Sequence, residues 1–152
     1  MDVSEIQIRR AKTGDVESIV RMLADDQLGA TRESTDDLGP YLRAFADLDG
    51  DPNQLLMVAD DGTGAVGTFQ LTIIPGLSHQ GASRGLIEGV RVAGSQRGTG
   101  LGTLLMQWAI EESRRRGCRI VQLTSNSSRA DAHRFYERLG FAGTHTGFKL
   151  VL

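Results

Sequence analysis

Cysteine is almost absent from this sequence, and its scarcity excludes any disulfide bond within the chain. The 152 residues include one cysteine, Cys118, and three histidines. These four side chains show no spacing typical of a metal site, so no metal is expected. A hydrophobic core must therefore hold the fold together, and the chain is long enough to bury one. A single cysteine also suits a reducing compartment.

Long apolar runs are missing as well. The first ten residues, MDVSEIQIRR, contain no apolar stretch of signal-peptide length. No segment approaches the roughly 20 consecutive apolar residues that span a bilayer. We therefore expect a soluble, cytoplasmic protein with no membrane partner, folded as one domain over residues 1–152.

An excess of positive charge is also lacking, and its absence argues against nucleic acid as a partner. The formal net charge is −2. The distribution is uneven, because residues 1–61 carry 14 acidic and 6 basic side chains, whereas residues 62–152 carry 5 acidic and 11 basic ones. The basic half is suited to a polyanionic cofactor and the acidic half to a cationic substrate. The alternative is that these charges are solvated and have no role.

Hydrophobic periodicity predicts a mixed α/β domain. Apolar residues at helical spacing predict four helices. Two begin near residues 13 and 38, and the other two span residues 101–116 and 128–139. Alternating or β-rich runs bounded by turn residues predict strands at 6–10, 54–60, 65–74, 85–92, 119–124 and 141–152. The polar residues 29–37 and 77–84 are predicted as loops.

A glycine-rich turn, Arg97-Gly98-Thr99-Gly100-Leu101-Gly102, joins a predicted strand to the strongest predicted helix. Uncovered backbone amides and the positive end of a helix together favour phosphate binding. The turn is not a dinucleotide fingerprint, because Thr103 stands where G-x-G-x-x-G needs glycine. It is not a nucleotide P-loop either, because it has no lysine. The remaining alternative is that the glycines only let the helix pack closely on the sheet.

Two motifs resemble those of the GNAT-type N-acetyltransferases. Arg97-x-x-Gly100-x-Gly102 is similar to the family motif R/Q-x-x-G-x-G/A, and residues 132–141 (AHRFYERLGF) are similar to A-x-x-[LF]-Y-x-x-x-G-F. The resemblance covers residue 85 to the C-terminus closely and the N-terminal third only in its pattern of elements. It implies a mostly antiparallel central sheet with helices on both faces, and acetyl-CoA as the acyl donor.

The same resemblance implies where the cofactor binds. A strand that diverges from its neighbour would offer the backbone of Val90 and Val92 to the pantetheine arm. Many family members have an asparagine three residues before the alanine of the second motif. This sequence has Arg129 at that position, and its nearest asparagine is Asn126. Either residue is therefore a candidate for contact with the cofactor. The amides implied to hold the pyrophosphate belong to Arg97, Gly98, Thr99, Gly100, Leu101, Gly102 and Thr103.

Two residues are candidates for proton transfer. The resemblance implies that Tyr136 protonates the leaving thiolate, whereas its place on an apolar stripe would suit an ordinary core aromatic. Strand alternation places Glu88 on the face of Leu86, Val90 and Val92, where an apolar setting would raise its pKa and suit a general base. The alternative is that Glu88 is a structural carboxylate paired with a basic residue. A bulge in the strand would also change the face of the sheet on which Glu88 lies.

The resulting hypothesis is an N-acetyltransferase that transfers an acetyl group from acetyl-CoA to a primary amine by direct attack in a ternary complex. The acceptor is a small-molecule or a protein amine, and family habit implies a homodimer. Two alternatives stay open: an acyl-CoA sensor or inactive subunit without turnover, and a transferase with a longer acyl-CoA donor.

Overall fold

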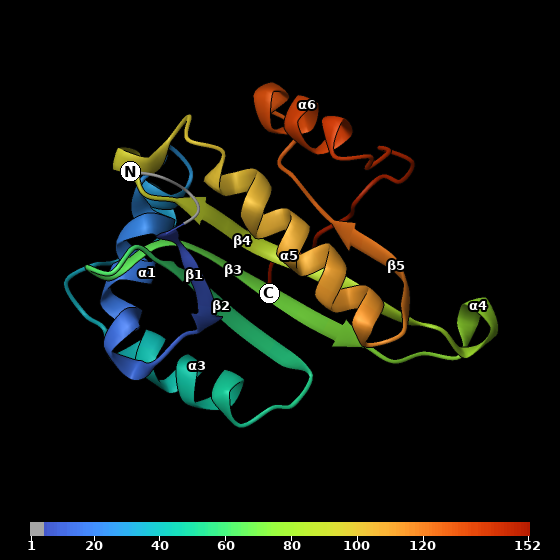
Figure 1. Ribbon diagram of the computed structural model, residues 1–152, viewed down its shortest axis with the longest axis horizontal. Coiled ribbons are helices and arrows are strands. Elements are labelled where there is room, and N and C mark those ends of the chain that lie inside the picture. Colours follow the sequence, from blue (N-terminus) through green and yellow to red (C-terminus); the bar gives the residue numbers. More distant parts are fainter. Residues whose placement is uncertain (1–4) are drawn as a thin grey trace.

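One five-stranded sheet organises the molecule, and its strands follow the order β1-β2-β3-β4-β5. The computed structural model describes residues 5–152 (Figure 1). The first four strands are antiparallel, and β5 runs parallel to β4. The elements are β1 (Gln7–Arg10), α1 (Val16–Ala24), α2 (Gly29–Arg32), α3 (Gly39–Asp49), β2 (Gln54–Asp60), β3 (Ala65–Ile74), α4 (Ser78–Gly81), β4 (Ser83–Val92), α5 (Leu101–Arg115), β5 (Cys118–Leu123) and α6 (Ala130–Arg138).

The predicted mixed α/β fold is confirmed, and two of its strands have the predicted bounds. β2 and β3 form a hairpin at the expected residues, 54–60 and 65–74. Gly62 and Gly64 have positive φ in the turn between them, and the Asp61 amide donates to the Gly64 carbonyl. Glycine is required there because other residues rarely adopt such φ values.

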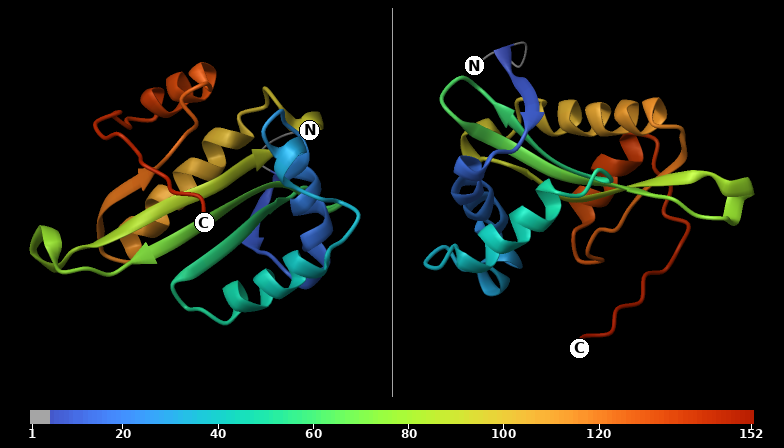
Figure 2. Two further views of the ribbon diagram at one scale, coloured as in Figure 1. Left: turned by 180° about the vertical axis from the view of Figure 1, so that it is seen from behind. Right: turned by 90° about the horizontal axis from the view of Figure 1, so that it is seen from below.

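Helices cover both faces of the sheet (Figure 2). On one face α5 packs on β3 and β4, and Leu105 and Met106 join Phe69, Leu71 and Ile87 in the larger buried cluster. On the other face α1 and α3 pack on the sheet through a second cluster. This second cluster contains Ala11, Val16, Ile19, Val20, Met22, Phe45 and Val58. The sheet is therefore a rigid layer from which side chains can be presented on either side.

The crossing of α5 over β4 is close enough to need glycine in the strand. A Cβ added to Gly85 would lie 2.6 Å from the Ser113 hydroxyl oxygen. Ser113 is fully buried and donates its hydroxyl proton to the Ala109 carbonyl, 2.8 Å away. This contact fixes the height of α5 above β4, and with it the position of the turn that precedes the helix.

Three expectations from the sequence were wrong. Residues 77–84 are not entirely a loop, because they contain the short helix α4, and β4 begins at Ser83. Residues 29–37 are not entirely a loop, because they begin with the short helix α2, whose Gly29 amide donates to the Asp26 carboxylate. The strand predicted for residues 141–152 does not form, and this segment runs away from the sheet as an extended tail (Figure 2). A strand needs a neighbour for its backbone groups, and the tail lies beside none. No helix among the described residues is long and apolar enough to cross a bilayer.

Replacing Leu105 by alanine should lower the free energy of unfolding by about 2–5 kcal/mol, because the change leaves a cavity in the larger cluster. Leu105 is 0% exposed, whereas Leu77 is 95% exposed. Leu77→Ala is therefore a matched control that should change stability by less than about 0.5 kcal/mol. Denaturant unfolding measures both, and equal effects would contradict the assignment of the core.

Candidate active site

The strands β4 and β5 separate halfway along β4, as the family resemblance implies. Their pairing runs from Ser83 opposite Cys118 to Ile87 opposite Leu123, where β5 ends. β4 continues to Val92 while it pairs only with β3. Backbone groups on the β5 side of residues 88–92 therefore face a gap between strands. An extended ligand with its own amide groups can pair with such an edge.

A bulge accompanies the separation. Glu88 lies opposite Gln70 and Arg91 lies opposite Thr68, so two residues of β4 occupy the space of one residue on β3. Gly89 is the first of these, and its φ of 62° is one that side-chain-bearing residues rarely adopt. A bulge of this kind bends the strand and changes which side chains share a face.

Because of the bulge, the face of the sheet predicted for Glu88 was wrong. Because it inserts one residue, Glu88 shares a face with Arg91 instead of Val90 and Val92, which pack with the α5 cluster. Glu88 is exposed and lies opposite Gln70, so the expected apolar surroundings of its carboxylate were wrong. The assignment of Glu88 as a general base stays a prediction, now on the face that α1 and α3 cover.

The glycine-rich turn leaves the start of α5 open. Gly98 and Gly100 have φ values of 78° and 89°, and a Cβ on either would meet nothing within 4 Å. Close packing therefore explains neither of these glycines. Gly102 lies closer to a neighbour, but its added Cβ would make an ordinary contact, 3.5 Å from the Phe135 ring of α6, so packing does not require glycine there either.

The amides of this turn are suited to an anion. No side chain caps α5, and Leu104 donates to the Gly100 carbonyl as the helix begins. The amides of Leu101, Gly102 and Thr103 lie in the first turn of the helix, where no helical carbonyl four residues earlier can accept from them. They therefore have no partner within the helix. They also lie at the positive end of the helix dipole, where a phosphate group binds favourably.

Tyr136 lies half-buried on α6 beside the open end of the sheet. Its ring packs edge-on against Phe135 and Phe141, with centroids 5.2 and 6.1 Å away. Burial raises the pKa of the Tyr136 hydroxyl, although the nearby guanidinium groups of Arg91 and Arg129 partly oppose this shift. Tyr136 is consequently protonated at neutral pH, the state that a proton donor requires.

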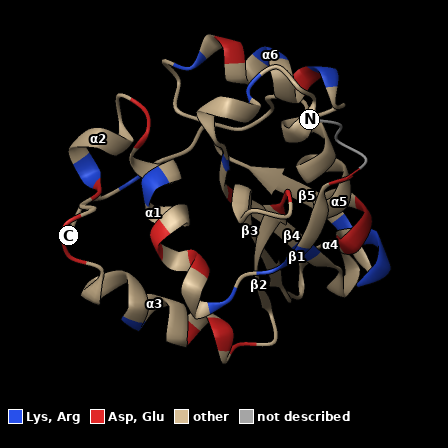
Figure 3. Cartoon of the chain, turned by 60° about the vertical axis from the view of Figure 1, so that its left-hand side comes forward, with Lys and Arg blue, Asp and Glu red and all other residues tan. Residues whose placement is uncertain are grey.

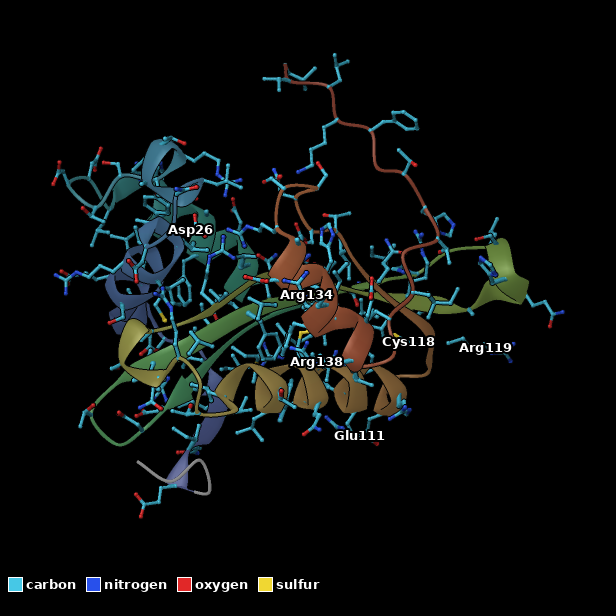
Figure 4. All side chains as sticks on the ribbon, turned by 90° about the horizontal axis from the view of Figure 1, so that it is seen from above. Asp26, Glu111, Cys118, Arg119, Arg134 and Arg138 are labelled. Carbon is cyan, nitrogen blue, oxygen red and sulfur yellow. The ribbon has the colours of Figure 1, made fainter. Side chains whose placement is uncertain are left out.

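Sequence reasoning missed an ionic cluster beside Tyr136. Asp26, just beyond α1, pairs with Arg91 of β4 at 3.3 Å and also with Arg129, which precedes α6. Figure 4 shows Asp26 on the side of α1 that faces α6. Asp26 and Arg129 are 103 residues apart, and no local motif marks this pairing. Only the fold brings these three residues together.

The acidic half that the sequence analysis assigns to a cationic substrate is therefore partly neutralised. Asp25 pairs with Arg97 at 3.1 Å, and Asp26 pairs with Arg91 and Arg129. Burial would raise the pKa of Asp26, but the Gly29 amide and the two guanidinium groups hold it below its usual value. Figure 3 shows both acidic and basic residues on α1 and on α6. The two oppositely charged halves of the sequence meet at this end of the sheet.

The remaining candidates have more limited roles in the structure. The Asn126 side-chain oxygen accepts hydrogen bonds from the Ser128 amide at 3.0 Å and from its hydroxyl at 2.6 Å. Asn126 thus shapes the loop before α6, while Arg129 is engaged with Asp26. Burial raises the pKa of the Cys118 thiol, which disfavours the reactive thiolate. Among the described residues no three His, Cys, Asp or Glu side chains form a metal-binding group.

Known proteins share both the sequence and the fold. Residues 17–141 match the acetyltransferase (GNAT) family. The chain is 30% identical to aminoalkylphosphonate N-acetyltransferase of Salmonella typhimurium, with 96% of this chain and 91% of that protein covered. It is 31% identical to glucosamine 6-phosphate N-acetyltransferase of Trypanosoma brucei brucei, with 99% of each covered. A crystal structure described as a transcriptional regulator from Bacillus halodurans C-125 matches at 45% identity and a TM-score of 0.93, covering 97% of this chain and 99% of that one.

The diverging strands, the open turn and these matches define the class of protein. The chain belongs to the GNAT acetyltransferase family. It is an acetyl-CoA-dependent acyltransferase whose reaction is acetyl transfer to an amine.

Replacing Gly100 by glutamate should abolish micromolar acetyl-CoA binding. The new side chain would strain a φ of 89° and place a negative charge where the phosphates are expected. Gly14→Glu adds the same charge at an exposed glycine without positive φ and should leave binding unchanged. Calorimetric titration measures both variants, and full binding by Gly100→Glu would contradict the assignment of the turn.

Proposed function

We propose that this protein transfers the acetyl group of acetyl-CoA to the primary amine of a small molecule by direct attack in a ternary complex. The observation that carries this proposal is the gap between β4 and β5, which leads to the uncapped start of α5. Tyr136 lies at the same end of the sheet. One reactant can thus lie along the strand while the other approaches from the α1 side, and holding both in place supplies much of the acceleration.

The cofactor would bind along residues 88–103. The backbone of Val90 and Val92 pairs with the pantetheine arm. The amides of Gly98, Gly100, Leu101, Gly102 and Thr103 hold the pyrophosphate, because those of Arg97 and Thr99 already donate to the Gly94 and Gln96 carbonyls. The Asn126 side chain lies in the loop that borders β5 and is the asparagine available to meet the cofactor from that side. Gly98 and Gly100 support this placement, because their positive φ has no packing explanation.

The chemistry needs three proton transfers, because the amine nitrogen loses two protons and the departing thiolate gains one. A primary amine arrives mostly as ammonium, with a pKa of about 10, so Glu88 accepts its proton directly or through water. The free amine then attacks the thioester carbonyl, a β4 amide stabilises the oxyanion, and the carbon–nitrogen bond forms as the carbon–sulfur bond breaks. Tyr136 gives its proton to the departing thiolate, and its phenolate regains a proton from the still-protonated nitrogen of the new amide, directly or through water. Direct transfer is favoured over an acyl-cysteine because Cys118 is disfavoured as a thiolate.

We also propose that the chain forms a homodimer in the cytoplasm. The tail after α6 exposes four apolar side chains, with 85–110% of their surface accessible. Large apolar side chains that are exposed together in one segment favour an interaction site. A second copy of the chain is the partner proposed for these residues, which are Phe148, Leu150, Val151 and Leu152.

The function is tested by incubating the protein with acetyl-CoA and a panel of primary amines while free thiol is measured. Release of coenzyme A together with a mass increase of one acetyl group on the amine is expected. Tight acetyl-CoA binding without turnover of any amine would support the sensor instead. Faster release from a longer acyl-CoA would identify a different donor.

Tyr136→Phe should lower kcat by about 100-fold while the KM for acetyl-CoA changes little, because only the proton donor is lost. Tyr41→Phe is the matched control, since the Tyr41 hydroxyl forms hydrogen bonds with Glu33 and Ser34 instead.

Glu88→Gln should also lower kcat, and the loss should shrink as the pH approaches about 10, where the amine is already deprotonated. A pH-independent loss would rule out Glu88 as the base.

Removing residues 148–152 should convert the dimer to a monomer without lowering the cooperativity of unfolding, because these side chains contact little of their own chain. Light scattering gives the two masses. A full-length chain that is monomeric at micromolar concentration would contradict the proposal, as would a truncated chain that stays dimeric.

A further inference from the structure

The ionic cluster around Arg91 carries more positive than negative charge. Besides Asp26, the charged side chains that act on the Arg91 guanidinium are Arg129 and Arg32. Among the strongest electrostatic neighbours of Arg91, its own guanidinium and two others thus share the single carboxylate of Asp26. Such an excess of guanidinium groups is costly in a partly buried site, and Arg91 is only 18% exposed. Because Arg129 also pairs with Asp26, this carboxylate is shared between two guanidinium groups.

Arg91 also has an unused hydrogen-bond donor. Its Nη1 donates to the Val90 carbonyl at 2.9 Å and its Nη2 pairs with Asp26, whereas its Nε is buried and has no partner among the described residues. An orphaned donor of this kind costs about 1–3 kcal/mol, and more on a charged group. Guanidinium donors lie in a planar fork that matches the paired oxygens of a phosphate or phosphonate group.

The bulge places this cluster on the side from which the acceptor approaches. Glu88 and Arg91 lie opposite Gln70 and Thr68, two residues apart on β3, so their backbones are about 7 Å apart on one face. Leu23 of α1 is near the same point, because a Cβ on Gly89 would lie 3.8 Å from it. A small acceptor can therefore present its amine to Glu88 and a second group to Arg91.

The phosphates of the cofactor are not the expected occupant. Val90 and Val92 face the α5 side of the sheet, and the turn that we assign to the pyrophosphate begins beyond Val92. Arg91 lies on the other face, with Asp26 of the α1 side as its partner. The second group that Arg91 meets belongs to the acceptor.

We propose that the acceptor amine carries a phosphate or phosphonate group, and that Arg91, with Arg129 and Arg32 beside it, binds this group. A phosphate monoester carries a charge of about −1.5 to −2 at neutral pH, which complements this cluster of guanidinium groups. The proposal rests on the proposed function, because it identifies the acceptor of that reaction. It replaces the cationic substrate that the acidic N-terminal half suggests.

The test compares acetylation of 2-aminoethylphosphonate with that of ethylamine, which lacks the phosphonate. In the wild type, kcat/KM should be at least about 100-fold higher for the phosphonate. Arg91→Gln should reduce this ratio by about 30-fold or more, and Arg129→Gln should reduce it less. Arg114→Gln is the matched control, because Arg114 lies on α5 and pairs with Glu111. Figure 4 shows Glu111 on the outward side of α5, away from Asp26.

Several outcomes would overturn the proposal. In one, the two amines react equally in the wild type, which leaves the acetyltransferase function intact but removes the anionic acceptor. In another, Arg91→Gln weakens acetyl-CoA binding or slows both amines equally, which assigns Arg91 to the cofactor or to the fold. If neither amine is acetylated, the proposed acetyl transfer does not extend to these two amines. Calorimetric titration with 2-aminoethylphosphonate then tests the anion site separately. Binding to the coenzyme A complex that Arg91→Gln abolishes supports the anion site, and absence of binding overturns it.

Discussion

The site depends on the loss of strand pairing after Ile87. While β4 is paired on both sides, its backbone groups are satisfied by β3 and β5 and can hold nothing else. Once β5 ends at Leu123, one edge of β4 is open for five residues, up to Val92. In the proposed cofactor site the binding groups therefore come from the backbone of the sheet, and the local side chains only have to leave room.

The bulge at Gly89 turns this single opening into two distinct surfaces. Because one extra residue is inserted, the side chains on the two sides of the bulge change faces. Val90 and Val92 then pack toward α5, on the side of the glycine-rich turn, whereas Glu88 and Arg91 lie toward α1. The donor and the acceptor can thus approach the same strand without competing for the same side chains.

Electrostatics joins parts of the chain that the fold brings together at this end. The carboxylates that follow α1 are paired with arginines of β4, of the turn before α5 and of the loop before α6. Ion pairs between exposed residues such as Asp25 and Arg97 contribute little stability. Their value lies in preorganising guanidinium groups near the place where anionic ligands are expected.

Much of this fold could be predicted from the sequence because its signals are local. Alternation and turn glycines give β2 and β3 their bounds, and the stripe through Leu101 and Leu105 identifies α5. The turn and Tyr136 are also found through short motifs. A bulge in this strand was an open alternative in the sequence analysis, but a glycine in a strand does not reveal the register, so the bulge at Gly89 could not be located.

Long-range features of the site lie beyond such reasoning. The pairing of Asp26 with Arg91 and Arg129 depends on how α1 and α6 lie against β4, and charge counts in the sequence pointed instead to a cationic acceptor. The predicted C-terminal strand failed for a similar reason. Its residues have the composition of a strand, but pairing requires a neighbouring strand that this segment lacks.

The most direct test of the central claim is backbone hydrogen exchange with and without saturating acetyl-CoA. If the open edge of β4 and the start of α5 form the cofactor site, amides in residues 88–92 and 98–103 should exchange more slowly when the cofactor is bound. The β1–β2 pairing should be unchanged, because it lies at the other edge of the sheet. Binding that leaves both segments unprotected would contradict the account.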